Sequence, residues 1–410
     1  MEYNVHPLPN GIRLLHVPSA STISHACIII NTGSRDEPEH KAGLAHFIEH
    51  LIFKRTEKRS TIQILNRLES VGADLNAYTT KEYTCVHASF LNPYLDRTLD
   101  LFSDIVFHST FPEEEMDKEK SVILDEIASY IDQPEEAIND DFEDMLFAGN
   151  PLGNNILGTT ETVNNFTRED VINFRKANYR TNEIVVAVLG NYSFKNVVTK
   201  GAKHFASIEE NTPPLNRIKP EILTPKTVNI YKPIMQSHCI LGTQTYSTHD
   251  KNKAGLMLLN NYFGGNGMSS VLNLQIRERY GIAYTIESNF SPLSDTGIFT
   301  IYFGTDKEKH QKALSSIFKE IKKLKEKPLN ELQLQKAKNK FIGQIALSEE
   351  NRIGLIISMA KSLIDHNKID SLDEVFEKIN KVTTKEIAQI VDEVLAPEKL
   401  NIFTFSPVLE

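Results

Sequence analysis

The sequence predicts a duplicated two-domain protein in which helices and strands are mixed. Three observations support this prediction. The chain has 410 residues, which is long for one hydrophobic core and enough for two domains. Short β-type segments and amphipathic helical segments follow one another along the chain. Two short patterns of the first half also recur in the second half at one constant spacing.

The repeat is visible residue by residue. Residues 237–240 (Ser-His-Cys-Ile) match 25–28 (His-Ala-Cys-Ile), and residues 253–256 repeat the Lys-Ala-Gly-Leu of 41–44. Both matches are 212 residues apart, from position 27 to 239 and from position 41 to 253. Two matches at one spacing indicate duplication rather than chance.

A break in composition separates the two halves. Prolines at 213, 214, 220 and 225 fall in a stretch without helical or strand periodicity. We therefore expect a first domain at 1–208, a linker at 209–226 and a homologous second domain at 227–410.

Local sequence signals predict the elements of the first half. Strands are expected where apolar and β-branched residues run together between turn signals: 12–17, 25–31 and 184–190. The alternating stretch 75–90 is expected to be a strand or a hairpin. Helices are expected where apolar residues recur at helical spacing: 61–71, 93–107, 112–131, 135–146 and 168–178. Ser60 caps the first of these helices, Gly72 ends it, and Pro112 suits the first turn of the third.

Composition argues against several classes of protein. The net charge is −9 and no basic, aromatic-interleaved patch is present, so we expect no nucleic-acid binding. No apolar run approaches the roughly 20 residues of a membrane span. The beginning of the sequence has no signal or transit pattern, and we expect a cytoplasmic protein. The three cysteines, Cys27, Cys85 and Cys239, are widely spaced, which suits core positions in a reducing compartment.

Negative charge is concentrated in one stretch. From Glu113 to Asp144 there are fourteen acidic residues against two lysines, Lys118 and Lys120. A solvated helical face explains this most simply. The functional alternative is a negative field that attracts basic peptides to a nearby site.

Residues 43–53 (Gly-Leu-Ala-His-Phe-Ile-Glu-His-Leu-Ile-Phe) form an apolar helix with three ionisable residues on one side. His46 and His50 are four residues apart and therefore leave the same face. Two neutral imidazoles, with positions left for a carboxylate and water, are typical of a catalytic zinc site, and Glu49 is placed to act as general base. This is the inverted His-x-x-Glu-His arrangement. Two satisfied histidines, in the core or on the surface, are the plainer interpretation, but buried ionisable groups are costly without a partner.

A catalytic zinc site needs one more protein ligand, and the acidic helix is its best source. Glu119 and Glu126 share one stripe of that helix with Val122 and Ile123, while Asp125 is rotated away. Carboxylates in an apolar stripe indicate partners: the metal for one, and the orientation of a ligand for the other. Spacing alone does not assign these two roles, and a solvated face is the alternative for either residue.

These features resemble the pitrilysin/insulinase family of zinc peptidases, especially its shorter branch, which includes mitochondrial processing peptidase-like bacterial proteins. The resemblance covers nearly the whole chain. Its strongest segments are these: His46 to His50, Gly72 to Thr79, Glu119 to Glu126, and Arg277 to Tyr284. The glycine-rich stretch of the family is present at 264–270, with Asn266 interrupting the run.

The resemblance implies a role for each matched residue. His46, His50 and Glu126 would bind one zinc ion per chain, and Glu126 lies 76 residues after His50, as the family spacing requires. Glu49 would be the general base and Glu119 the supporting carboxylate.

The resemblance also implies a substrate site. Asn76 and Ala77 would hold an extended substrate backbone, since an exposed strand edge can add a peptide as an extra strand. Arg277 and Tyr284 would complete the catalytic site from the second half and stabilise the oxyanion. Without the resemblance, these two residues would be an ordinary helix-end charge and a strand aromatic.

The fold that the resemblance implies is α+β, with each half a sandwich of a mainly antiparallel sheet and helices, the fold shared by mitochondrial processing peptidases and the quorum-signal synthase. The 212-residue spacing places His46, Glu49 and His50 at 258, 261 and 262, which are Leu, Asn and Tyr. The second half therefore has the fold without the metal ligands.

We therefore expect a zinc metalloendopeptidase that cleaves unfolded peptides, basic ones included, bound as an added β-strand in a clamshell chamber. Longer relatives build that chamber from four units. This chain has two, so a homodimer is expected, with the second half of one chain facing the first half of the other.

Two alternatives differ in class. A non-catalytic peptide-binding or scaffold subunit of the same fold would typically lose part of the metal set. A small-molecule lyase with the inverted motif, like the quorum-signal synthase that cleaves S-ribosylhomocysteine, would be short, unduplicated and would use a cysteine ligand.

Overall fold

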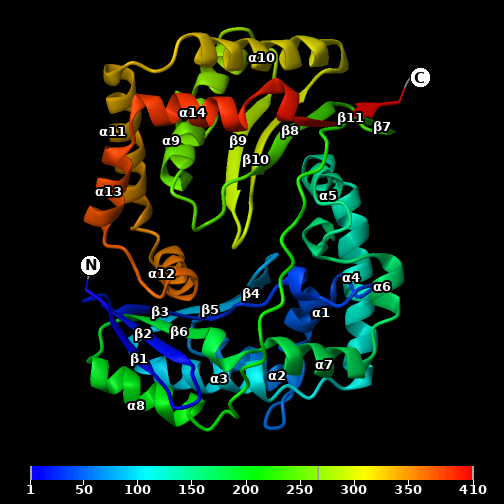
Figure 1. Cartoon of the computed structure of the whole chain (residues 1–410). Helices are drawn as coiled ribbons and strands as arrows, with labels where there is room; N and C mark the ends of the chain where they lie inside the picture. The colour runs from blue at the N-terminus through cyan, green and yellow to red at the C-terminus, as the bar shows by residue number, and fades with distance from the viewer. Residues whose placement is uncertain (1, 266, 409–410) are drawn as a thin grey trace. The chain divides into compact units, whose positions relative to one another are not determined.

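The computed structural model describes residues 2–265 and 267–408, and their contacts divide the chain into two compact units (Figure 1). The first unit contains the residues up to Ala128, Asn154–Ile218 and Ser348–Ile369. The second contains Ser129–Gly153, Lys219–Leu347 and the residues from Asp370 on. Asn266 of the expected glycine-rich stretch lies outside the described residues.

The first unit is built on a six-stranded sheet with the order β1-β2-β6-β3-β5-β4. Its strands are β1 (Asn4–Pro7), β2 (Arg13–Pro18), β3 (Ile23–Ile30), β4 (Asp74–Thr79), β5 (Thr84–Leu91) and β6 (Ile184–Gly190). β2 and β6 pair in parallel, and all other neighbours are antiparallel. β6 is apolar on both of its faces and is buried at every residue, as expected for a central strand.

One face of this sheet carries the main core of the first unit. The helices that contribute to it are α1 (Leu44–Leu51), α2 (Thr61–Glu69), α3 (Leu95–Phe107), α4 (Glu113–Ile131), α6 (Thr160–Asn164), α7 (Arg168–Asn178) and α8 (Phe194–Phe205). Strand alternation sorts the side chains: Ile28 and Ile30 of β3 face this core, whereas Cys27 and Ile29 face the other side.

The opposite face of the same sheet is covered by a helix from late in the chain, α12 (Arg352–His366). Figure 1 shows α12 next to β3. Its apolar residues Ile356, Met359, Ala360 and Leu363 pack on β2, β3, β5 and β6. Arg13 of β2 donates from Nη1 to the carbonyl oxygen of Leu363 at 2.9 Å and so holds the end of the helix.

The second unit is built on a five-stranded sheet with the order β7-β11-β8-β10-β9. Its strands are β7 (Thr227–Lys232), β8 (Ser237–Thr245), β9 (Thr285–Pro292), β10 (Gly297–Thr305) and β11 (Asn401–Pro407). β7 and β11 are parallel, and the other pairs are antiparallel.

The second unit also has helices on both faces of its sheet. The main core involves a π-helical turn, Asn273–Glu278, and the α-helices α9 (Lys253–Phe263), α10 (His310–Glu326), α11 (Glu331–Ser348), α13 (Leu372–Lys381) and α14 (Thr384–Val394). The other face is covered by α5 (Pro134–Leu146), whose Ile138 and Phe142 pack on β8, β10 and β11. This helix comes from the first half of the sequence.

The two sheets confirm the predicted duplication and the α+β class. The strand order β2-β6-β3-β5-β4 of the first unit equals β7-β11-β8-β10-β9 of the second. β9 and β10 begin 211 and 213 residues after β4 and β5 (285 against 74, and 297 against 84), close to the spacing of the sequence repeat.

The compact units differ from the expected domains in two segments. The sequence assigns α5 to the first domain and α12 to the second, but α5 packs in the second unit and α12 in the first. We call this arrangement the helix exchange. Both helices are amphipathic, and their sequences do not say which of two similar sheets they cover.

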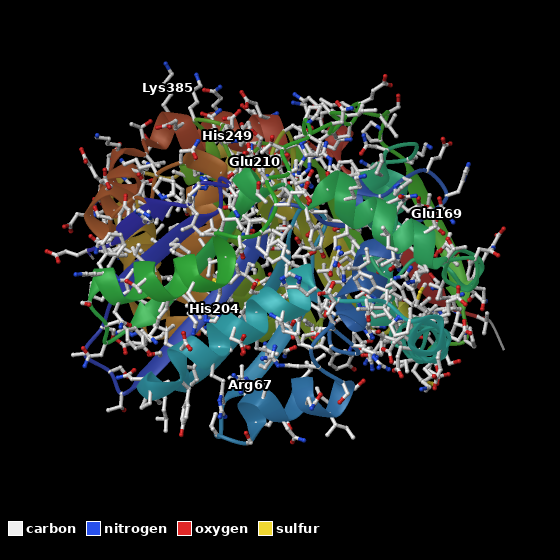
Figure 2. The ribbon with its side chains drawn as sticks, turned by 90° about the horizontal axis from the view of Figure 1, so that it is seen from below. Arg67, Glu169, His204, Glu210, His249 and Lys385 are labelled. Atoms are coloured by element: carbon white, nitrogen blue, oxygen red, sulfur yellow. The ribbon has the colours of Figure 1, made fainter. Side chains whose placement is uncertain are left out.

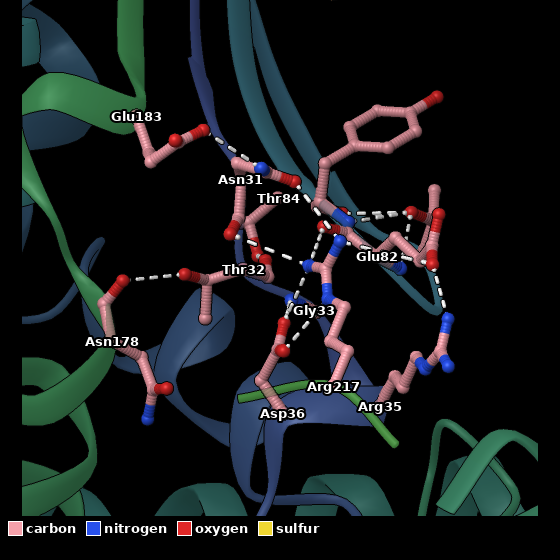
Figure 3. Close-up of polar contacts among 12 residues, drawn as sticks. Asn31, Thr32, Gly33, Arg35, Asp36, Glu82, Thr84, Asn178, Glu183 and Arg217 are labelled. Atoms are coloured by element: carbon pink, nitrogen blue, oxygen red, sulfur yellow. Dashed lines mark hydrogen bonds and ion pairs between the residues drawn. The ribbon is translucent and has the colours of Figure 1, made fainter. Parts of the chain in front are cut away.

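The segment expected to be a linker has no regular secondary structure from 209 to 226, yet its first part is tied to the first unit. Asn211 donates to the carbonyl oxygens of Lys176 (2.8 Å) and Tyr179 (3.0 Å). Arg217 lies in a polar cluster that Figure 3 shows. Its guanidinium donates to both carboxylate oxygens of Asp36, at 2.9 and 2.8 Å, and to the carbonyl oxygen of Glu82 at 2.8 Å.

Partly buried polar side chains of the first unit are also paired between helices. Arg67 of α2 bonds Asp100 of α3 at 3.0 Å, and His204 of α8 contacts Asp96 of α3 at 3.1 Å; Figure 2 labels Arg67 and His204. The Lys203 ammonium is the main reason that the pKa of Asp96 falls to about 2. Across the described residues, none of the helices combines the length and the apolar character that a membrane span requires.

Arg217→Met should lower the free energy of unfolding by about 3 kcal/mol, because Asp36 would stay buried without its cation. The side chains of both residues are almost inaccessible, 6% and 4% exposed. Urea unfolding at neutral pH measures the change. Lys385→Met, at an exposed position of α14 that Figure 2 labels, is the control and should change stability by less than about 0.5 kcal/mol. Equal stability of the two variants would contradict this role of Arg217.

Candidate metal centre

The helix with the inverted motif, α1, is held by its apolar side. Leu44, Phe47, Ile48 and Leu51 are at most 1% exposed and belong to the main core of the first unit. Burying these four side chains fixes the rotation of the helix about its axis. The polar side chains of α1 therefore face a fixed direction.

The beginning of α1 is capped from a distance. Gly43 precedes the helix with φ of 94°, and no side chain at that position can cap it. The two carboxylate oxygens of Glu37 instead accept from the backbone N–H groups of Gly43 (3.0 Å) and Ala45 (2.8 Å). A Cβ at Gly43 would come within 2.6 Å of the carbonyl oxygen of Leu157, so both space and φ require glycine.

The structure brings together the three expected metal ligands. Nε2 of His46 lies 3.8 Å and Nε2 of His50 3.6 Å from Oε2 of Glu126. One ligand atom from each of the three residues lies within 4.8 Å of the others. Two of these residues come from α1 and the third from α4, so the cluster depends on how these helices pack.

The donor set of this cluster fits a zinc ion. Two imidazole nitrogens and one carboxylate oxygen form a common set of protein ligands in catalytic zinc sites. Burial, with the neighbouring His50 as second cause, lowers the pKa of His46 to about 3, so His46 is the neutral imidazole that a metal requires. Burial also lowers the pKa of His50, but Glu119, Glu49 and Glu126 outweigh this effect and the net shift is upward.

The packing of α4 separates the roles of its two carboxylates, which spacing left open. Glu119 is buried, and its Oε2 lies 3.0 Å from Nδ1 of His50, on the side of the ring away from Glu126. Glu126 is half exposed and faces both Nε2 atoms. The expected apolar stripe was partly wrong, because Ile123 is buried whereas Val122 is 47% exposed.

One cation and one hydroxyl that the sequence analysis did not assign to the site also contact it, Lys54 and Thr79. Lys54, in the turn after α1, places Nζ 2.6 Å from Oε1 of Glu119. Thr79, the last residue of β4, donates its hydroxyl to Oε2 of Glu49 at 3.0 Å. Burial raises the pKa of Glu49, and the Thr79 hydrogen bond opposes that shift. The only signal that could have pointed to Lys54 was the need of the buried Glu119 carboxylate for a counter-ion.

The expected substrate residues lie on β4, at the edge of the first sheet. Among the described strands, β4 has one neighbour, β5, so its outer edge is unpaired. Asn76 is exposed, and Ala77 points to the same face as Thr79, two residues on. The strand that carries both residues therefore ends at Thr79, the residue that holds Glu49.

Arg277 and Tyr284 belong to the second unit, whereas the metal cluster belongs to the first. Arg277 belongs to the π-helical turn, and its Nε is 3.8 Å from Glu278. Tyr284 is 54% exposed, and its hydroxyl donates to Oδ1 of Asp306 at 3.0 Å. Their catalytic role stays a prediction.

Family models and related proteins match most of the chain. Residues 14–160 match the family described as insulinase (peptidase family M16), and residues 165–341 match the peptidase M16 inactive domain. A Bacillus subtilis protein called uncharacterized zinc protease YmxG is 32% identical over 379 residues, which cover 92% of each chain. The chain belongs to the insulinase family. A Streptomyces coelicolor relative, uncharacterized zinc protease SCO5738, is 31% identical over 95% of this chain and 86% of its own.

Solved structures share the fold of this insulinase-family chain. A protease from Helicobacter pylori superposes with a TM-score of 0.90 and 21% identity, and covers 99% of both chains. The structure described as a peptidase M16 inactive domain from Pseudomonas fluorescens superposes with a TM-score of 0.91 and 19% identity, over 100% of this chain and 99% of its own. At these identities the likeness concerns the fold alone.

The second matched region is consistent with the lost ligands of the second half. The positions that correspond to His46, Glu49 and His50 are Leu258, Asn261 and Tyr262 on α9. Leu258 is part of the core of the second unit. Asn261 donates its amide to Oε1 of Gln344 at 2.8 Å, so its polar group is used within the unit.

Glu126→Gln should weaken zinc binding by more than about 100-fold, because a ligand affects the metal more than its supporting residues do. Competition with a chromophoric chelator measures the affinity. Glu114→Gln is the matched control, since Glu114 lies on the same helix and its side chain is 81% exposed. Zinc binding by Glu126→Gln with the affinity of the control would contradict the assignment of the third ligand.

Proposed function

We propose that this insulinase-family protein is a zinc-dependent endopeptidase that cleaves unfolded peptides. The observation that carries the proposal is the convergence of His46, His50 and Glu126 within 4.8 Å, beside Glu49. The relatives that are called zinc proteases support a peptidase in general terms. A scaffold subunit would not need to keep the whole set of ligands and the adjacent carboxylate.

The residues of α1 and α4 would hold one zinc ion per chain. His46 and His50 would bind it through Nε2 and Glu126 through a carboxylate oxygen. A bound zinc ion would supply Lewis-acid polarisation and acidify water. Glu119 accepts from Nδ1 of His50, which fixes the tautomer that presents Nε2 to the metal.

Glu49 is the general base of the proposed reaction. Its carboxylate takes the proton of the attacking water and later delivers it to the leaving amine. Thr79 holds one oxygen of Glu49 at 3.0 Å, which leaves the other oxygen for the water. The partial burial of Glu49 favours proton transfer near neutral pH because it raises the pKa toward that range.

The unpaired edge of β4 is the proposed binding site for the substrate backbone. A peptide added as a strand would bond the main chain near Asn76 and Ala77. Such binding requires an extended peptide and depends little on its side chains. A folded domain cannot present its backbone in this way, so unfolded peptides are the expected substrates.

Arg277 and Tyr284 are the proposed stabilisers of the oxyanion, and we assign them to the second half of a partner chain. A guanidinium and a phenol hydroxyl can both donate to a developing negative charge. A homodimer that encloses the substrate in a chamber would supply them, with each second half facing the first half of the other chain.

Basic peptides are the favoured substrates in this proposal. α4 begins with Glu113, Glu114 and Glu115, and α5 has Glu135 and Glu136 in its first turn. Their field would attract positively charged segments. We place the enzyme in the cytoplasm, and its three unpaired, buried cysteines agree with a reducing compartment.

Glu49→Gln should lower kcat by about 10²- to 10⁴-fold on an unstructured basic peptide, because the general base is removed while the zinc ligands stay. Mass spectrometry of the cleavage products and zinc analysis of the same samples measure both properties. Glu69→Gln, an exposed position on α2, is the control. Cleavage by Glu49→Gln at the rate of the control would rule out the proposed mechanism.

Mixing two inactive variants tests the proposed homodimer. His50→Ala lacks a metal ligand and Arg277→Ala lacks the oxyanion donor, so each should be inactive alone. Mixed dimers contain one intact site, and partial activity should return. Inactive mixtures in which mixed dimers are demonstrably present would show that the sites are not completed across subunits.

A further inference from the structure

The turn after α1 carries a lysine whose side chain points back toward the metal cluster. The backbone of Lys54 is fixed at both groups: its N–H donates to Leu51 at 3.1 Å, and its carbonyl oxygen accepts from the hydroxyl of Thr61 at 2.5 Å. The side chain is 26% exposed. Lys54 is therefore anchored between the end of α1 and the beginning of α2.

The partner of Lys54 is a carboxylate with few other means of charge compensation. Glu119 is 5% exposed at its side chain, and its two oxygens have different partners. Oε1 lies 2.6 Å from the ammonium of Lys54, and Oε2 lies 3.0 Å from Nδ1 of His50. A buried carboxylate without a cation is strongly disfavoured, so the ammonium allows Glu119 to stay charged in this position.

The same contact sets the direction in which Glu119 faces. Two contacts on opposite oxygens define the plane and the rotation of the carboxylate group. Because Oε1 is held by Lys54, Oε2 is directed at His50, whose Nε2 then faces Glu126 at 3.6 Å. Partners of this kind commonly change metal affinity by 10- to 100-fold when they are removed.

We propose that Lys54 is a positioning residue of the metal centre, which acts on His50 through Glu119. The inference rests on the proposed zinc site and adds a residue to it. Lys54 itself contacts neither metal nor substrate in this assignment. A purely structural lysine would affect the stability of the fold and leave the zinc affinity of the folded protein unchanged.

The test measures zinc affinity of the full-length protein, by chelator competition at 25 °C. Lys54→Met should weaken zinc binding about 10-fold, whereas Lys54→Arg keeps the charge and should stay within about threefold of the parent. Lys58→Met, an exposed lysine four residues further along, is the matched control and should bind zinc like the parent. Circular dichroism before each titration shows that the variant is folded.

A double-mutant cycle with Glu119→Gln tests whether Lys54 acts through Glu119. If it does, Lys54→Met/Glu119→Gln should bind zinc as Glu119→Gln does, because the contact is already lost. Neither of these two variants carries the buried carboxylate of Glu119, so their comparison stays informative even if Lys54→Met alone does not fold.

Three results would overturn the inference, and they are distinguishable. Parent-like affinity of Lys54→Met would exclude the role of Lys54 while leaving the zinc site intact. A further loss of about 10-fold in the double variant would show that Lys54 acts independently of Glu119. A parent protein that binds no zinc would overturn the proposed function together with this inference.

Discussion

The burial of one side of α1 is the constraint on which the candidate site depends. The helix spans only eight residues, and four large apolar side chains anchor it: Leu44, Phe47, Ile48 and Leu51. Glu37 fixes its beginning through two backbone N–H groups. With its rotation and its first turn fixed, α1 directs His46 and His50 toward α4 and Glu49 toward β4.

Most residues of the candidate site could be predicted from the sequence. The two histidines and Glu49 lie on one short helix, and helix geometry alone puts them on one side. Glu119 and Glu126 were also identifiable, because carboxylates in an apolar stripe need partners. Which of the two binds the metal could not be predicted, since this depends on the distance and tilt between α1 and α4. Without the family resemblance, Glu126 as third ligand would have remained one of two options.

The errors and omissions have the same origin in tertiary packing. Val122 has the same helical spacing as its buried neighbours, but α4 turns it to solvent. Lys54 is one residue beyond an apolar run, and only the position of Glu119 gives it a function. The elements and the duplication follow from periodicity and from the 212-residue repeat. The helix exchange does not, because the sequence of a helix does not tell which of two similar sheets it covers.

The helix exchange has a consequence for how the chain is made on the ribosome. When the first half has been synthesised, its sheet still lacks α12, which begins at Arg352. Until then the apolar face that includes Leu15, Cys27 and Ile29 has no cover from its own unit. Nascent chains that do not yet contain α12 therefore expose an apolar sheet surface, and the first unit is completed only after α12 has been synthesised. For the two halves to evolve as separable modules, each sheet would need a covering helix from its own half of the sequence.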